Sequence, residues 1–363
     1  MIPCRPSSSH IWRNCHGYPR LVAALPRGWE TTSSDPAREG TCAAWVAEMV
    51  LQGHYKSTDV MVGEMHANGW VVDQDMANFV QGYLDLLHER YGDMVVVEER
   101  VKLSEFIAGT PDAFAVIDDH LYVDDLKYGH SIVEPWENPQ IMIYAGAIAK
   151  ASPVQINHVT IGVYQPRVSH PLGHHRTWSP SLEELSDHLV QLVEASREAQ
   201  REDAMCIAGE HCRHCDAAHR CSAVAFENYR AVSFMRNDQQ RELTNEEMSA
   251  ELAFIELAEA ILSGRKTAIK ADAKARIASG QLIEGWSLER GVGQRRWTCD
   301  AETVKLMTGI DPMSDKMVTP AELERRGANK DLVGTMTNQP KTAPQLKRFN
   351  ARVAGADFKG FNK

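Results

Sequence analysis

The sequence has no run of about 20 uninterrupted apolar residues, the length needed to cross a bilayer, which argues against a transmembrane protein. Its first 20 residues lack the apolar core of a signal peptide, so we expect a cytoplasmic protein. Internal repeats and long low-complexity tracts are also missing. Because the formal net charge is −10, a simple polycation that coats nucleic acid is not expected either.

The length of 363 residues favours two domains, at roughly 150 residues per domain. We expect a boundary near residue 240, between a first domain, 1–240, and a C-terminal extension, 241–363. From Gly264 onward the chain carries 19 Lys and Arg against 11 Asp and Glu, whereas the preceding residues carry 20 against 38. This asymmetry indicates either nucleic-acid contact through the basic part or a solvated basic face without a ligand.

Hydrophobic spacing and turn residues predict a mixture of helices and strands. Residues 1–36 are rich in Pro, Ser, Arg and Trp and are expected to be irregular, and residues 118–120 are expected to form a hairpin turn. The order of the elements indicates a mixed α/β core rather than a regular doubly wound sheet. Helices are expected over 36–53, 73–90, 138–150, 181–202 and 244–279, and strands over 94–101, 113–118, 121–127 and 154–166.

Two carboxylates and a lysine fall on neighbouring predicted strands. Asp112 begins one strand, and Asp125 and Lys127 lie two residues apart on the next, so the last two side chains project from the same face. If the strands pair across the turn, the three groups converge at one end of the sheet. Two carboxylates can bind Mg²⁺ or Mn²⁺, and a lysine beside them can orient a water and stabilise charge on a phosphate.

Two short motifs carry a resemblance to a known family. Pro111-Asp112 followed by Asp125-Leu-Lys127 resembles the PD-(D/E)xK nuclease signature, and Gly109-Thr-Pro-Asp112 resembles its RecB-type variant. Gln140-Ile-Met-Ile-Tyr144 resembles the Q-x-x-x-Y on the helix after the core strands in RecB-like exonucleases. An exposed hairpin with a salt-bridged Asp–Lys pair, followed by an ordinary amphipathic helix, is the alternative interpretation.

The resemblance implies a fold and a set of roles. The fold would be α/β and restriction-endonuclease-like, with a mixed sheet flanked by helices and a helical, basic C-terminal extension. Asp112 and Asp125 would bind the metal and Lys127 would assist the attacking water. Gln140 and Tyr144 would position the DNA strand.

One element departs from the family pattern. RecB-type members usually carry G-x-x-x-H on the first core helix, whereas the matching segment here, Glu39-Gly-Thr-Cys-Ala-Ala44, has Ala44 at the histidine position. Glu48, one helical turn further along, could reach the metal instead, as a glutamate does in phage λ-type exonucleases. Glu39 is the weaker candidate, and a plain solvated helix carboxylate is the alternative for both.

The eight cysteines are better explained as metal ligands or buried thiols than as disulfides, because the chain is long and has no signal sequence. Cys212, Cys215 and Cys221 form C-x2-C-x5-C, and three thiolates this close need a fourth ligand to complete a zinc site or a four-iron cluster. Cys299 lies far away in the sequence and is expected to be structural.

The C-x2-C-x5-C spacing downstream of Q-x-x-x-Y resembles the iron–sulfur nucleases, namely AddB-type subunits and the CRISPR-associated exonucleases. That resemblance implies a [4Fe–4S] cluster whose fourth cysteine precedes the nuclease core, so that the cluster joins the two ends of the domain. Cys15 is the choice for this role, and zinc at the same thiolates is the main alternative. The competing cysteines are Cys4, Cys42 and Cys206, and the histidines that keep zinc open are His211, His214 and His219.

The C-terminal region combines basic and aromatic residues, a composition that suits a nucleic-acid backbone and an exposed base. Trp286 and Trp297 flank a predicted hairpin, and tryptophans packed within a small hairpin are the alternative explanation. The candidate DNA-binding residues are Lys266, Lys270 and Lys274 at helical spacing and Arg290, Arg295 and Arg296 on the hairpin.

The whole pattern resembles a family encoded by phages and prophages and catalogued as a domain of unknown function. The resemblance implies a metal-dependent DNA exonuclease that processes DNA ends in phage recombination or replication inside a bacterial host. The implied partners are DNA and a single-strand annealing protein, and a homo-oligomer is left open. The alternatives are a structure-specific endonuclease and a catalytically inactive DNA-binding module of the same fold.

Overall fold

A computed structural model describes residues 2–25, 35–236, 242–292, 295–313, 317–339 and 341–348. Contacts divide the chain into two units, Met1–Asp272 and Ala273–Lys363. The first unit contains every residue of the predicted nuclease motifs. The predicted boundary at residue 240 lies outside the described residues and stays a prediction.

A five-stranded mixed sheet forms the centre of the first unit, in the order β1-β4-β5-β6-β7. Only the β5–β6 pair is parallel, and the other neighbours are antiparallel. The predicted mixed α/β fold is therefore confirmed. The strands are β1 (Val96–Val97), β4 (Ala113–Ile117), β5 (His120–Leu126), β6 (His158–Tyr164) and β7 (His175–Trp178), and β2 (Val101–Lys102) pairs with β3 (Ala108–Gly109) in a separate ribbon.

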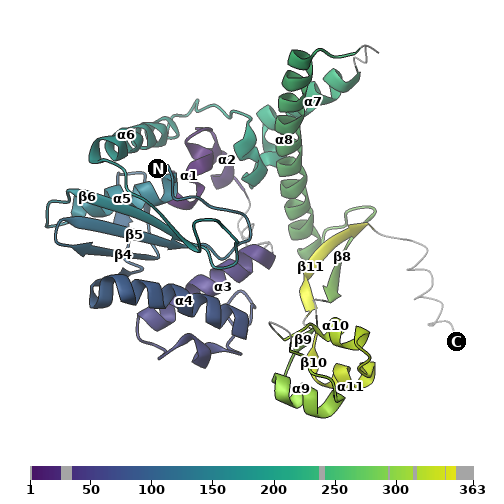
Figure 1. Cartoon of the computed structure of the whole chain (residues 1–363). Coiled ribbons are helices and arrows are strands. Elements are labelled where there is room, and N and C mark those ends of the chain that lie inside the picture. The colour runs from purple at the N-terminus through teal and green to yellow at the C-terminus, as the bar shows by residue number, and fades with distance from the viewer. Residues whose placement is uncertain are drawn as a thin grey trace. The chain divides into compact units, whose positions relative to one another are not determined.

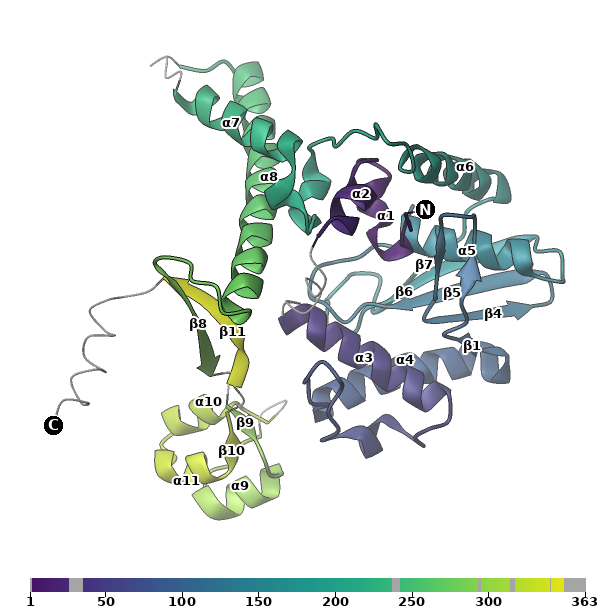
Figure 2. The ribbon, with the colours of Figure 1, turned by 180° about the vertical axis from the view of Figure 1, so that it is seen from behind.

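Helices cover both faces of this sheet (Figures 1 and 2). One face packs against α3 and α4, and the other packs against α5, α6 and the N-terminal helices. The separate apolar cores on the two sides of the sheet make it the middle layer of three. The helices are α1 (Ser9–Trp12), α2 (Tyr18–Ala23), α3 (Asp35–Leu51), α4 (Gln74–Tyr91), α5 (Pro139–Ala151), α6 (Leu182–Glu198), α7 (Ser222–Arg236) and α8 (Asn245–Ala278).

The β4–β5 hairpin matches the predicted turn. Ile117 pairs with His120, so two residues connect the strands, and the first of them, Asp118, has φ +56°. Aspartate tolerates this left-handed conformation, which two-residue hairpin turns of the favoured twist require.

Two predictions about the N-terminal half are wrong. The expected strand over 94–101 is interrupted at Glu98, where φ is +51°, so only Val96–Val97 joins the sheet. The expected irregular segment 1–36 contains α1 and α2, and Trp12 is fully buried in the core beneath them. A short helix gains stability by burying such a side chain, which spacing patterns over four to six residues do not reveal.

The second unit contains two small sheets and three short helices among its described residues. β8 (Trp286–Val292) pairs with β11 (Lys341–Arg348), and β9 (Arg296–Trp297) pairs with β10 (Thr337–Asn338). The predicted hairpin between Trp286 and Trp297 is therefore wrong, because both arms pair with strands about 40 to 60 residues further along the chain. The helices are α9 (Ala301–Thr308), α10 (Pro320–Arg325) and α11 (Lys330–Thr335).

No helix in the described part of the chain is long and apolar enough to span a membrane.

Candidate active site and cysteine group

The register of the hairpin places the two predicted metal-binding carboxylates side by side. Ala113 lies opposite Asp124, so the preceding Asp112 and the following Asp125 are neighbours at the open end of β4 and β5. The Oδ2 atom of Asp112 accepts a hydrogen bond of 2.8 Å from the backbone nitrogen of Leu126, which fixes its orientation. Asp125 is 1% exposed.

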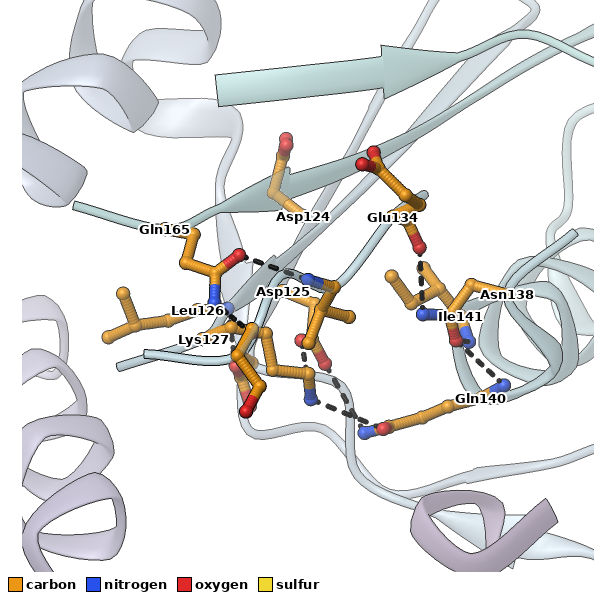
Figure 3. Close-up of polar contacts among 12 residues, drawn as sticks. Asp124, Asp125, Leu126, Lys127, Glu134, Asn138, Gln140, Ile141 and Gln165 are labelled. Carbon is orange, nitrogen blue, oxygen red and sulfur yellow. Dashed lines mark hydrogen bonds and ion pairs between the residues drawn. The ribbon is translucent and has the colours of Figure 1, made fainter. Parts of the chain in front are cut away.

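Lys127 and Gln140 both contact Asp125 (Figure 3). Lys127 Nζ lies 2.7 Å from Asp125 Oδ2, and Gln140 Nε2 donates to Asp125 Oδ1 at 3.2 Å. Lys127 Nζ also donates to Gln140 Oε1 at 3.2 Å, so the three side chains form a closed triangle. Gln140 reaches this position because Asn138 caps α5 and its side chain accepts from the Gln140 backbone at 3.1 Å.

Tyr144 lies one turn after Gln140 on α5 and is buried. Burial raises the pKa of its hydroxyl, which interacts with the Gln140 side chain. A Cβ atom on Gly109 would lie 3.0 Å from the Tyr144 ring and 2.8 Å from Pro6, so the first residue of Gly109-Thr-Pro-Asp112 must be small. All five predicted catalytic residues therefore gather at one end of the sheet.

This end of the sheet carries more negative than positive charge. Burial and the Asp125 carboxylate raise the pKa of Asp112, and Glu98 adds to the effect. Burial and the charge of Glu48 raise the pKa of Glu98 in turn. Sequence reasoning missed Glu98, because its only signal was the break in the predicted strand. Burial would lower the pKa of Lys127, but Asp125 and Asp112 outweigh it and hold that pKa high.

The carboxylate oxygens of Asp112 and Asp125 are the type of ligand that a hard divalent cation prefers. Mg²⁺ is usually bound through one or two carboxylates, with waters and substrate oxygens completing its shell. Asp112 and Asp125 supply two such carboxylates, and Glu98 adds a further negative charge near Asp112. Within the described residues no three His, Cys, Asp or Glu side chains converge on one ion position, so the protein itself would supply only part of the shell.

The residues near the missing family histidine are arranged as follows. Ala44 and Glu48 are half-buried on α3, and Gln52 Nε2 donates to Glu48 Oε1 at 3.1 Å. Glu39 forms an ion pair of 2.7 Å with Arg167, which occupies its carboxylate. A metal-binding role for Glu48 stays a prediction.

Asp124 projects from β5 on the side opposite to Asp125 (Figure 3) and belongs to a second polar network. Asp124 is buried, its Oδ2 accepts from Tyr91 Oη at 2.7 Å, and its Oδ1 lies 2.7 Å from His175 Nε2. A Cβ atom on Gly162 would overlap Asp124 Oδ1 and lie 2.7 Å from His175 Nε2, so the network requires glycine there. These residues carry no periodic signal in the sequence, because they come from four different elements.

The cysteines of C-x2-C-x5-C lie next to the N-terminal helices. Cys206 interacts with both Cys15 and Cys221, and its hydrogen bonds lower the pKa values of those two thiols. Cys212 and Cys215 are close enough for their charges to interact. Five cysteines therefore lie near one another, because Cys206, one of the competitors for the fourth position, lies beside Cys15. Within the described residues no three of them converge on one ion position.

The backbone holds this cysteine group in place. Ile207 N donates to Cys15 Sγ, and Gly209 N donates to Cys212 Sγ, both at 3.4 Å. A Cβ atom on Gly17 would lie 2.6 Å from Cys206 Sγ, so glycine permits the close approach of the two segments. Cysteine sulfurs that accept hydrogen bonds from backbone nitrogens are the kind of ligand that iron–sulfur and zinc centres use. Burial raises the pKa of Cys215 to about 12, so that thiol would have to lose its proton on binding a metal.

The other candidate ligands differ in their surroundings. His211 contacts Cys15 and Cys212, and these contacts raise its pKa to about 10. The other two histidines have different partners, because the His214 ring faces His10 at 5.9 Å and His219 lies 3.8 Å from Asp272. The remaining cysteines lie in three other places: Cys4 beside Ser196, Cys42 in the core under α4, and Cys299 in the core of the second unit.

The predicted DNA-binding residues fall into three groups. Lys266 and Lys270 are exposed and Lys274 is half-exposed, all on α8. Arg295 forms an ion pair with Glu324, whose Oε2 lies 2.9 Å from Arg295 Nη2, so its charge is already compensated. The side chains of Arg290 and Arg296 lie outside the described residues.

The chain belongs to a family described as "Protein of unknown function (DUF2800)", whose model matches residues 4–350. It is similar to a solved structure from Eubacterium rectale that is described as a proposed exonuclease, with a TM-score of 0.33, 10% identity and coverage of 55% of this chain and 83% of that one. A phage-related exonuclease from Haemophilus somnus 129PT is similar over 55% of this chain and 93% of its own, with a TM-score of 0.27 and 14% identity. Similarity at this level does not transfer an activity to this chain.

Proposed function

We propose that this protein is a Mg²⁺- or Mn²⁺-dependent deoxyribonuclease that acts as an exonuclease on DNA ends in phage recombination or replication. The observation that carries the proposal is the convergence of Asp112, Asp125, Lys127 and Gln140 at one end of the sheet. Two adjacent carboxylates with a lysine bound to one of them supply the groups that phosphodiester hydrolysis needs.

The role of each residue follows from its contacts. Asp112 and Asp125 would hold the metal ion, which supplies a water of lowered pKa and offsets charge on the phosphate. Lys127 reaches the same face as Asp125, so its ammonium can orient the attacking water and stabilise negative charge that develops on the phosphate oxygens. Gln140 fixes Lys127 and Asp125 relative to each other, and Tyr144 supports Gln140 from the buried side.

The cysteine group would hold a [4Fe–4S] cluster through Cys15, Cys212, Cys215 and Cys221, with Zn²⁺ as the alternative metal. Such a centre would join the N-terminal helices to the segment after α6. The hydrogen bonds across the same junction, such as that from Gly17 N to Met205 O at 2.9 Å, support this role. Cys206 lies next to Cys15 and Cys221 and is the competitor for the fourth position.

The test is to incubate the purified protein and Mg²⁺ with end-labelled linear duplex and with covalently closed circular DNA. Release of mononucleotides or short products from linear DNA alone, abolished by EDTA, is expected. Cleavage of the circle would indicate an endonuclease instead. No hydrolysis of either substrate, together with retained DNA binding, would overturn the enzymatic proposal in favour of a binding module.

The partners proposed from the sequence are DNA and a phage single-strand annealing protein. Co-purification of the tagged protein with an annealing protein encoded beside it would test the second partner. A homo-oligomer would be detected by analytical ultracentrifugation of the same preparation.

A further inference from the structure

Buried side chains hold the loop between Lys127 and Gln140 in place. This loop, 128–138, leads from Lys127 at the end of β5 to Gln140 at the start of α5. Gln165, which is fully buried, donates through Nε2 to Gly129 O at 3.0 Å and to Ser131 O at 2.7 Å. Its Oε1 accepts from Val133 N at 3.1 Å, so one amide satisfies three backbone groups of the loop (Figure 3).

Arg176 on β7 completes the anchorage. Its Nη2 donates to Gln165 Oε1 at 2.7 Å and to Val133 O at 2.8 Å, and its Nε lies 3.4 Å from Glu134 Oε2. Burial of a guanidinium is costly unless the charge is paired and hydrogen-bonded, as it is here. The buried side chains of Gln165 and Arg176 therefore fix the conformation of the exposed loop 128–138.

The loop presents one large aromatic side chain to solvent. Trp136 is 62% exposed, and its ring lies against that of Trp178, which is 6% exposed, with 5.3 Å between the ring centroids. Two hydrogen bonds close the turn around it, from Asn138 N to Pro135 O at 3.2 Å and from Asn138 Nδ2 to Glu134 O at 3.1 Å. Trp136 is therefore held in place from the backbone and from one side of its ring.

We propose that Trp136 is a stacking platform for an unpaired base of the DNA strand that enters the active site. The proposal rests on the proposed nuclease function and adds a substrate contact to it. A fixed, accessible indole offers a π-face that stacks any base without sequence preference. Trp136 and Gln140 are four positions apart in the sequence, so their Cα atoms lie within about 14 Å, the length of about four stacked nucleotides.

A base fits this position better than a protein partner does. Ser131, Glu134 and Glu137 are exposed in the same loop, and Ile132, 57% exposed, is its other exposed apolar side chain. The loop thus offers two apolar side chains among polar ones rather than a broad apolar face. The nearby carboxylate of Glu134 is paired with Arg176 and lies 3.3 Å from His170, which reduces its repulsion of a phosphate backbone.

The test uses the full-length protein carrying Asp125→Ala, so that DNA is bound but not cleaved. Fluorescence anisotropy measures the affinity for a labelled single-stranded oligonucleotide and for a blunt duplex, before and after Trp136→Ala. Loss of one base-stacking contact should weaken single-strand binding about 5- to 100-fold. Trp136→Phe should retain most of the affinity, because it keeps an aromatic face.

Val154→Ala is the matched control. Val154 is an exposed apolar residue shortly before the start of β6, at the end of the sheet opposite to the candidate active site. The substitution should leave both affinities unchanged. A 2-aminopurine placed near the strand end should be quenched on binding, and Trp136→Ala should relieve the quenching. If Trp136→Ala lowers the affinity for single-stranded and for duplex DNA equally, the proposal that Trp136 stacks on an unpaired base is overturned.

The outcomes separate this proposal from the one on which it rests. Unchanged DNA affinity of the Trp136→Ala variant, with metal-dependent hydrolysis by the wild-type chain, would overturn the platform and leave the nuclease. A change in sedimentation without a change in DNA affinity would overturn it in favour of protein docking. Absence of both hydrolysis and DNA binding would overturn both proposals.

Discussion

His175 Nε2 lies 2.7 Å from Asp124 Oδ1, directly behind the strand position that presents Asp125 to the candidate active site. Tyr91 Oη donates to the other oxygen of the same carboxylate, and Tyr83 Oη donates to the Asp124 carbonyl oxygen at 3.1 Å. The residue next to the candidate metal ligand is thus tied to α4 and β7 by directed hydrogen bonds. Any displacement of β5 that moves Asp125 would strain these bonds.

Asp124→Ala should lower the free energy of unfolding by about 3–5 kcal/mol, because it leaves the partly buried His175 and the buried Tyr91 without their partner. Gly162→Ala should also be strongly destabilising in the wild-type chain, because the new methyl group would overlap Asp124 Oδ1. The same change should cost less in the Asp124→Ala background, giving a coupling of about 0.5–3 kcal/mol in urea unfolding.

Gly40→Ala is the control for these two variants. Gly40 lies within α3, and outside the neighbouring helix backbone no atom lies within 4 Å of the added Cβ. The substitution should be neutral or stabilising by up to about 1 kcal/mol. Additive effects of Asp124→Ala and Gly162→Ala would contradict the steric explanation of the glycine.

Asp125→Ala should reduce DNA hydrolysis by at least about 10³-fold, because it removes one of two carboxylates that hold the metal, an effect worth several kcal/mol. The fold should survive, since the neighbouring network through Asp124 is untouched. Steady-state hydrolysis of labelled linear DNA measures the loss, and Asp119→Ala in the exposed hairpin turn is the control. Wild-type turnover by the Asp125 variant would rule out the proposed site.

Anaerobically purified protein should be brown and contain about four irons per chain, as a cluster bound by four cysteines requires. Cys15→Ser should lose the iron, whereas Cys4→Ser should keep it, because Cys4 is buried beside Ser196 rather than in the cysteine group. Iron and zinc analysis with absorption spectra provides the measurement. Colourless protein with one zinc per chain would establish the alternative metal.

Replacing Lys266, Lys270 and Lys274 together with glutamine should weaken DNA binding and make its salt dependence shallower. If each lysine neutralises one phosphate, the slope of log K against log salt should fall by about 2.7 for duplex DNA. Lys305→Gln is the control, because Lys305 is ion-paired with Asp311 at 2.6 Å. Identical slopes for the triple variant and the wild type would contradict DNA contact through this helix face.

The sequence predicted those parts of the fold whose signals are local. The spacing over 73–90 predicts α4 to within one residue at each end, because Asp73 caps it and its apolar residues repeat with the helical period. The convergence of Asp112, Asp125 and Lys127 also followed from short-range features, namely a two-residue turn and the alternation of side chains along a strand.

The rest depended on contacts between distant segments. Gln165 and Arg176 look like ordinary polar residues in the sequence, and only the fold shows that both are buried against the loop after Lys127. Glu98 carried no motif, and the pairing of β8 with β11 spans about 50 residues. Long-range pairing of this kind leaves no periodic trace in a single sequence.

The N-terminal segment pairs with residues that are synthesised much later. Ile2 exchanges two hydrogen bonds with the side chain of Gln200, and Gly17 bonds to Met205, so these contacts span almost 200 positions. At about 5–20 residues per second, a ribosome needs roughly 10–40 s to make the intervening chain. Trp12 and Cys15 therefore emerge long before the groups that bury them, and during that interval they are exposed to chaperones, oxidants and competing metal ions.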